Sequence, residues 1–446
     1  MKKLVATILF GAAMTPAFSN VASAATRTVC FGLSFREGRT TANSPASTEP
    51  GNLRGRHANN TPTPAVGHLY ELWDKDPDGA DEFIARYIKT TDGRGCATFE
   101  WEGAPWEVHR GEPNPDVYVK YINEVRHTGL QGDKVRALDG ANLALPRHPN
   151  ITWRNGNAAD PDAYVAMNCT GTCDITAPGI NLAITTSNTT ARSDRVLALD
   201  TAQRALEIFN AEFDYASDGV IEMIFPCVVG VTPGSSCPGA ASAVDRETFI
   251  VNGTGGATNG RSPAHELGHL LHFIELGRDG LAFDYSLNGA SWGRTVAEFE
   301  SAAVMEGWAD FVSVASWWDD QDVTSLPRVA NLQVEAAQPF NATCSANSGL
   351  PLQVTKGFWD LIDANNEAAV APANRADTFD TSPRAVSDGW ARFGDGTGNR
   401  DDNEPSGGDS DGRNLRDYFH NNKSVFGSGF FTSLMNHNCT GTQDNN

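Results

Sequence analysis

Two histidines in the segment HELGH, residues 265–269, have the spacing of metal ligands. On a helix, His265 and His269 leave the same face one turn apart, so both imidazoles can bind one zinc ion. Glu266 lies between them and is too close in sequence to complete the same coordination comfortably. Its carboxylate is instead placed to deprotonate the attacking water. The segment therefore predicts a hydrolytic zinc site.

A catalytic zinc site takes three protein ligands and leaves one position open, so a further ligand must come from elsewhere in the chain. The segment MEGWADF offers Glu306 and Asp310, which are four residues apart and would share one face of a second helix. Glu306 is the predicted third ligand. Asp310 is predicted to accept the second N–H of a ligating histidine and so to fix its tautomer.

Local signals define the two helices that must position these groups. Ser262 can cap a helix expected from Pro263 to Leu276, with proline at its first position and Gly277 after its end. The second helix is expected to open with the capping-box pair Thr295 and Glu298 and to run to about residue 317.

These residues resemble the gluzincin clan of zinc metallopeptidases, to which the thermolysin-like enzymes belong. The resemblance implies an α/β upper part and a mostly helical lower part, covering about residues 193–440. It also implies a role for each matched residue: His265, His269 and Glu306 as zinc ligands, Glu266 as general base, and Asp310 as the residue that orients a histidine.

Differences from two related groups of zinc peptidases narrow the predicted class of enzyme. The longer metzincin pattern requires Gly at position 272 and His at 275, where this chain has His272 and Glu275, so that class is excluded. No GAMEN-like segment is present, which favours an endopeptidase over an aminopeptidase. The late candidates for stabilising the oxyanion are Tyr418, His420 and His437, and His420 is the predicted catalytic residue among them.

The predicted catalytic domain covers residues 193–446. Apolar residues at helical spacing predict a helix over 193–213, and strands are expected at 220–225 and 247–251, before the metal helix. A further amphipathic helix is expected over 357–367.

Residues 25–180 are predicted to form an accessory β-sandwich, because short apolar alternations at 68–73, 96–101 and 117–122 are separated by turn residues. The runs LWDKDPDGADEF and TTDGRGCATFEWE resemble the transthyretin-like or carboxypeptidase-regulatory-like sandwich. The expected fold class is therefore multidomain, with an N-terminal β-sandwich followed by an α+β zincin domain. The sandwich is interpreted as a binding module, with a removable inhibitory segment as the alternative.

An acidic loop in this region places Asp74, Asp76 and Asp78 at alternate positions before Gly79, as in some calcium sites. Position 85 is alanine, where an EF-hand would supply a bidentate glutamate. Calcium binding and a solvated turn both stay open, and the missing glutamate favours the turn.

Export is predicted by residues 1–24, where two lysines, a short apolar run and Ala-Ser-Ala have the order of a signal peptide. The run is too short for a bilayer span of roughly 20 residues. We therefore expect a secreted protein without a membrane anchor after cleavage.

Eight cysteines in an exported chain indicate disulfides. Connectivity does not follow from the sequence. The economical pairing joins neighbours in the chain: Cys30 with Cys96, Cys169 with Cys173, Cys227 with Cys237, and Cys344 with Cys439.

The net charge of −21 argues against a nucleic-acid partner. The predicted function is a secreted zinc endopeptidase acting on protein or peptide substrates. Two alternatives stay open, namely a zincin scaffold that binds or adheres without turnover and a zinc amidase that acts on cell-wall peptides.

Overall fold

The fold is that of a computed structural model. It describes residues 24–34, 63–64, 67–74, 82–87, 96–102, 117–126, 134–144, 151–153, 181–185, 191–215, 220–228, 248–251, 262–275, 293–295, 300–318, 320–321, 327–329, 332–334, 350–363, 381–393, 418 and 422–426.

Within the described residues, the larger sheet is mixed and follows the order β11-β10-β7-β6-β3-β4, with β8 also pairing with β6. Its strands are β3 (His68–Asp74), β4 (Glu82–Tyr87), β6 (Val117–Arg126), β7 (Lys134–Leu138), β8 (Ile151–Trp153), β10 (Val220–Ile224) and β11 (Thr248–Ile250). Strand β10 runs parallel to both β7 and β11. Because β7 belongs to the predicted accessory domain and β10 to the predicted catalytic domain, strands from both regions share one sheet.

A smaller sheet has the order β2-β1-β5, with β9 pairing with β1. Its strands are β1 (Ala24–Ser34), β2 (Thr63–Pro64), β5 (Cys96–Glu102) and β9 (Asn181–Thr185). The antiparallel register of β1 and β5 places Cys30 opposite Cys96, a pair that the sequence predicted to be bridged. Cys227 is disulfide-bonded, and its predicted partner Cys237 lies outside the described residues.

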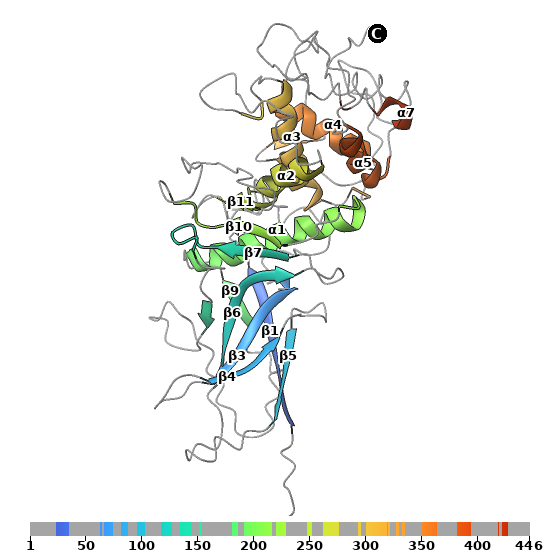
Figure 1. Cartoon of the computed structure of the whole chain (residues 1–446). Coiled ribbons are helices and arrows are strands. Elements are labelled where there is room, and N and C mark those ends of the chain that lie inside the picture. Colours follow the sequence, from blue (N-terminus) through green and yellow to red (C-terminus); the bar gives the residue numbers. More distant parts are fainter. Residues whose placement is uncertain are drawn as a thin grey trace, which may run out of the picture.

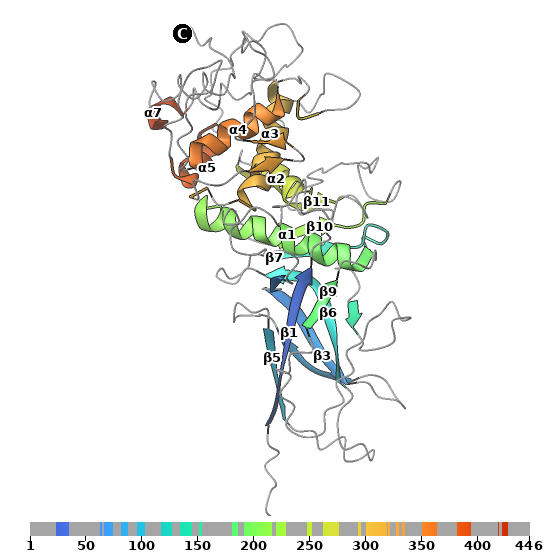
Figure 2. The same cartoon turned by 180° about the vertical axis from the view of Figure 1, so that it is seen from behind.

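The helices lie beyond one end of strands β1, β3, β5 and β6 (Figures 1 and 2). They are α1 (Ala191–Glu212), α2 (Ser262–Glu275), α3 (Glu300–Ala315), α4 (Pro351–Ile362), α5 (Pro383–Phe393) and α7 (Lys423–Phe426). In both views α1 lies between the strands β1, β3, β5 and β6 and the group formed by α2, α3, α4 and α5. Helix α2 packs against α1 and α3, and α3 packs against α4, so α2 lies between two other helices. None of the described helices is long and apolar enough to cross a bilayer.

One buried apolar cluster joins these layers. It includes Val125 and Val135 of the sheet, Leu206 of α1, Leu270 of α2 and Trp308 of α3. A buried polar contact adds to it, because His68 Nε2 of β3 lies 3.0 Å from Asp200 Oδ1 of α1. The helix α1 is therefore held on strands that precede it by more than fifty residues.

The local predictions are largely confirmed. Helix α2 begins and ends one residue earlier than expected, and β3, β5 and β6 occupy the predicted segments. The predicted bounds of the helix over 357–367 were wrong, because the observed helix, α4, begins at Pro351 and ends at Ile362. Its N-cap, Leu350, makes no side-chain hydrogen bond, so the usual polar start signal is missing and only the proline at its first turn marks the start.

The second predicted helix is described from Glu300 onward as α3, which ends at Ala315, two residues before the expected end. Thr295 lies in a turn, and Glu298 is outside the described residues. Other predictions also fall outside them: residues 1–23 of the predicted signal peptide, Asp76, Asp78, His420 and His437. Asp74 is the last residue of β3.

Candidate metal centre

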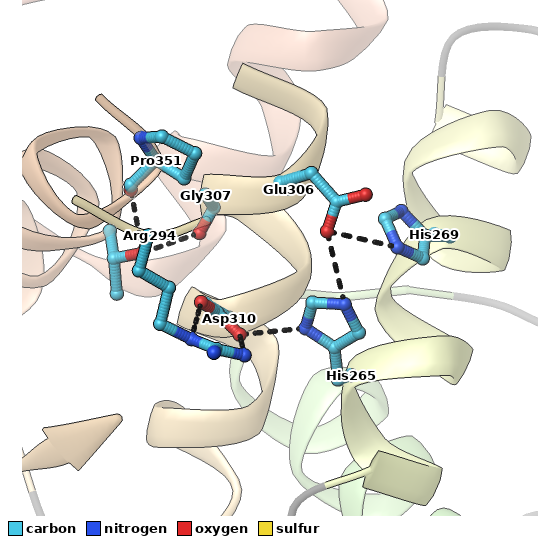
Figure 3. A network of polar contacts seen from close by, with 8 residues as sticks. His265, His269, Arg294, Glu306, Gly307, Asp310 and Pro351 are labelled. Carbon is cyan, nitrogen blue, oxygen red and sulfur yellow. Dashed lines mark hydrogen bonds and ion pairs between the residues drawn. The ribbon is translucent and has the colours of Figure 1, made fainter. Parts of the chain in front are cut away.

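The two helices that carry the predicted site residues lie side by side, as Figure 3 shows. His265 and His269 project from α2 toward α3, with ring centroids 4.8 Å apart and ring planes nearly perpendicular. The same helix also carries Leu267, Leu270 and Leu271, which are fully buried in the core. The pair is therefore presented by a helix whose apolar face is anchored.

The close approach of α2 and α3 depends on a glycine. A Cβ atom at Gly268 would lie 2.8 Å from the Cα of Ala309 and 3.0 Å from the Cβ of Val312. The helix interior is an unfavourable place for glycine, by about 1 kcal/mol relative to alanine, so a glycine there often has a packing reason. The glycine is visible in the segment HELGH, but the sequence does not show which helix it packs against.

Glu306 reaches the two histidines from α3. Its Oε2 atom lies 3.3 Å from Nε2 of His265 and 3.7 Å from Nε2 of His269. In a tetrahedral site with bonds of about 2.0–2.2 Å to zinc, ligand atoms lie roughly 3.3–3.6 Å apart. Both separations are close to that spacing, as an ion shared by Glu306 and the two histidines would require.

Glu266 is a second carboxylate near the histidine pair. Its oxygen and the two histidine nitrogens all lie within 4.8 Å of one another, and its side chain is half-buried. Either glutamate could thus be named as the third ligand by proximity alone. We favour Glu306, because its oxygen is close to both Nε2 atoms at once, and this leaves Glu266 available as a base.

Asp310 binds the other nitrogen of His265. Its Oδ1 atom lies 2.7 Å from Nδ1 in a fully buried position. Burial disfavours the charged imidazole, but the negative charge and hydrogen bond of Asp310 outweigh it, with Glu306 adding to the effect, so the pKa of His265 is well above its usual value. A neutral His265 that donates from Nδ1 to Asp310 has its Nε2 lone pair directed toward Glu306 and His269.

His269 differs from His265 in its protonation. Burial lowers the pKa of His269 to about 4, and the neighbouring His265 adds to the lowering, against the opposing charge of Glu306. His269 is consequently neutral at physiological pH, which is the form that binds a metal.

Arg294 is a site residue that the sequence analysis missed. Its Nε atom lies 2.6 Å from Oδ2 of Asp310, and its Nη2 atom lies 3.3 Å from Oδ1 (Figure 3). No local pattern marks this residue, because it lies before α3 in the chain and meets Asp310 only in the folded structure.

Helix α4 supports α3 directly beside Glu306. A Cβ atom at Gly307 would lie 2.5 Å from Cβ of Val354 and 2.7 Å from the Pro351 carbonyl oxygen. The Thr355 hydroxyl lies 3.0 Å from the carbonyl oxygens of both Gly307 and Pro351. The turn of α3 that carries Glu306 is therefore packed tightly on its far side, as the sticks in Figure 3 indicate.

Two other residues considered from the sequence lie in the core. The Tyr418 hydroxyl donates a hydrogen bond to the Val386 carbonyl at 2.7 Å, so this group is engaged with the backbone of α5. His272 is buried, with its ring centroid 4.4 Å from that of Trp390. Burial lowers the pKa of His272 to about 3, and the neighbouring His269 contributes in the same direction.

Comparison of the chain with protein-family models, with curated proteins and with solved structures found no match.

Proposed function

We propose that this chain is a secreted zinc-dependent endopeptidase. The proposal rests above all on Glu306 Oε2, which lies near Nε2 of both His265 and His269 at separations suited to a tetrahedral zinc site. The buried contact of His265 with Asp310 supports it, because ligating histidines commonly donate their other N–H to such an acceptor.

In this proposal His265, His269 and Glu306 hold the ion, with Glu266 beside them. A bound zinc ion would act as a Lewis acid on the scissile carbonyl and would lower the pKa of a water molecule to about 7. Glu266 accepts a proton from the attacking water and then gives it to the leaving amine. Asp310 holds the Nδ1 proton of His265, so the ring keeps one orientation throughout.

The remaining parts of the proposal rest on the sequence. The signal-peptide pattern supports export from the cytoplasm, and the net charge of −21 disfavours a nucleic-acid partner. His420 is proposed as the group that stabilises the oxyanion, and calcium binding at Asp74, Asp76 and Asp78 stays a minor proposal.

Metal analysis and a proteolysis assay test the function together. The purified mature protein should contain about one zinc ion per chain and should cleave casein, and a chelator should abolish cleavage. Glu266→Gln should keep the zinc but lose hydrolysis, because the amide cannot accept the proton. Glu222→Gln is the matched control, since it makes the same change on β10, where the side chain pairs with Arg136. Casein cleavage by Glu266→Gln at the wild-type rate would refute the mechanism.

The same preparation separates the two alternatives. Mass spectrometry of products from protein and peptidoglycan substrates would identify an amidase by cleavage of the peptidoglycan alone. Bound zinc without turnover on either substrate would favour the binding scaffold.

A further inference from the structure

Arg294 lies where three segments of the candidate metal centre meet. Its guanidinium contacts Asp310 of α3, and its carbonyl oxygen accepts a hydrogen bond from the Leu352 N–H in the first turn of α4 at 3.1 Å. The side chain is only 18 % exposed. Both ends of the residue are therefore anchored, which limits the directions from which the guanidinium can approach Asp310.

The contact engages both oxygens of the Asp310 carboxylate. Nε lies 2.6 Å from Oδ2, and Nη2 lies 3.3 Å from Oδ1, the same oxygen that lies 2.7 Å from Nδ1 of His265. The guanidinium thus places its charge against one carboxylate oxygen and donates a hydrogen bond from Nη2 to the other. This matters because the Asp310 side chain is 0 % exposed, and a buried carboxylate without a cationic partner is strongly destabilised.

We propose that Arg294 is a positioning residue of the metal centre. By holding Asp310 in one orientation, it keeps the acceptor for the His265 Nδ1–H in place and so directs Nε2 toward the metal. The inference rests on the proposed function for the identity of the ion, although the contacts that carry it belong to the chain alone. Lysine in place of Arg294 would supply the charge but not the two-point contact.

Zinc affinity of the purified protein, measured by competition with a chromophoric chelator, tests this role. Asp310→Asn should raise the Kd for zinc by roughly 10- to 100-fold, the usual effect of losing such a partner. Arg294→Met should raise it by about tenfold, and Arg294→Lys by a smaller factor. Arg384→Met is the matched control, because Arg384 pairs with Asp214 at the surface, where both side chains are more than half exposed. It should leave the Kd unchanged.

A double variant distinguishes positioning from a general loss of stability. If Arg294 acts through Asp310, adding Arg294→Met to Asp310→Asn should change the Kd less than about twofold. The visible spectrum of the cobalt-substituted protein should also change in Arg294→Met and be unaltered in Arg384→Met, because it reports ligand geometry. Arg294→Lys retains the charge beside Asp310, so it supplies a folded variant if Arg294→Met does not fold.

Two results would overturn the inference: a zinc Kd for Arg294→Met and Arg294→Lys equal to that of Arg384→Met, or the same fold-change from Arg294→Met with and without Asp310→Asn. Neither result depends on catalysis. A wild-type protein that binds zinc but cleaves no substrate would defeat the proposed function and leave the Arg294 test intact. A wild-type protein that binds no zinc would defeat both.

Discussion

Gly268 of α2 lies directly against the backbone of Ala309 of α3, where a Cβ atom would be 2.8 Å from the Ala309 Cα. Each residue precedes a member of the candidate site, His269 in one helix and Asp310 in the other. The close packing of the two backbones is therefore what brings the histidines of α2 within reach of the carboxylates of α3.

Gly268→Ala should separate the two helices. Alanine normally stabilises a helix interior by roughly 0.5–1 kcal/mol over glycine, but here the added methyl meets backbone that cannot rotate away. We expect the free energy of unfolding to fall by about 1–3 kcal/mol and the zinc Kd to rise. Thermal unfolding and chelator competition measure the two effects. A melting temperature equal to or above that of the wild type would contradict the packing argument.

Gly307→Ala should act on the opposite side of α3. Its methyl would meet Val354 and the Pro351 carbonyl of α4, and the displaced turn carries Glu306. Both stability and zinc affinity should therefore fall. Gly389→Ala, on α5, is the control, because its methyl would instead meet the side chain of Tyr418. That variant should lose stability while keeping the zinc affinity of the wild type, and equal losses of affinity in the two variants would rule out a local effect on Glu306.

His272 should make stability depend on pH. Its pKa is about 3 in the fold and about 6.5 in an unfolded chain, so the unfolded state binds the proton more readily between these values. The free energy of unfolding that neutral His272 contributes is fully present above about pH 6.5 and is lost as the pH falls toward 3. At pH 5 the loss is about 2 kcal/mol.

His272→Phe removes this titration and keeps an aromatic ring beside Trp390. Urea unfolding of the metal-free proteins at pH 7 and pH 5 gives the comparison. The wild type should lose about 2 kcal/mol more than the variant over this interval. Equal losses would mean that His272 is not buried in its neutral form.

Removal of the N-terminal region should prevent the catalytic region from folding. Strand β10 pairs with β7, and α1 packs on β6 and β7, so a fragment covering residues 186–446 would expose one side of β10 and part of α1. We expect this fragment to lack a cooperative thermal transition by circular dichroism. A sharp transition would instead support a separable accessory domain, as first predicted for residues 25–180.

Local sequence determined the parts of the site that lie within one helix. The helical signals around HELGH predict α2, and the interval of four residues places His265 and His269 on one face, whatever the rest of the chain does. The same holds for Glu306 and Asp310 on α3. Periodicity is a property of a single element, so it can be read before the fold is known.

Tertiary structure decided how these elements meet. The short distance from Glu306 to both histidines, the backbone contact at Gly268 and the anchoring of Asp310 by Arg294 all join residues far apart in the chain. So does the pairing of β7 with β10 across the predicted domain boundary. Such contacts depend on how side chains pack and how buried charges are paired between different helices and strands. The periodicity of a single helix or strand does not show this.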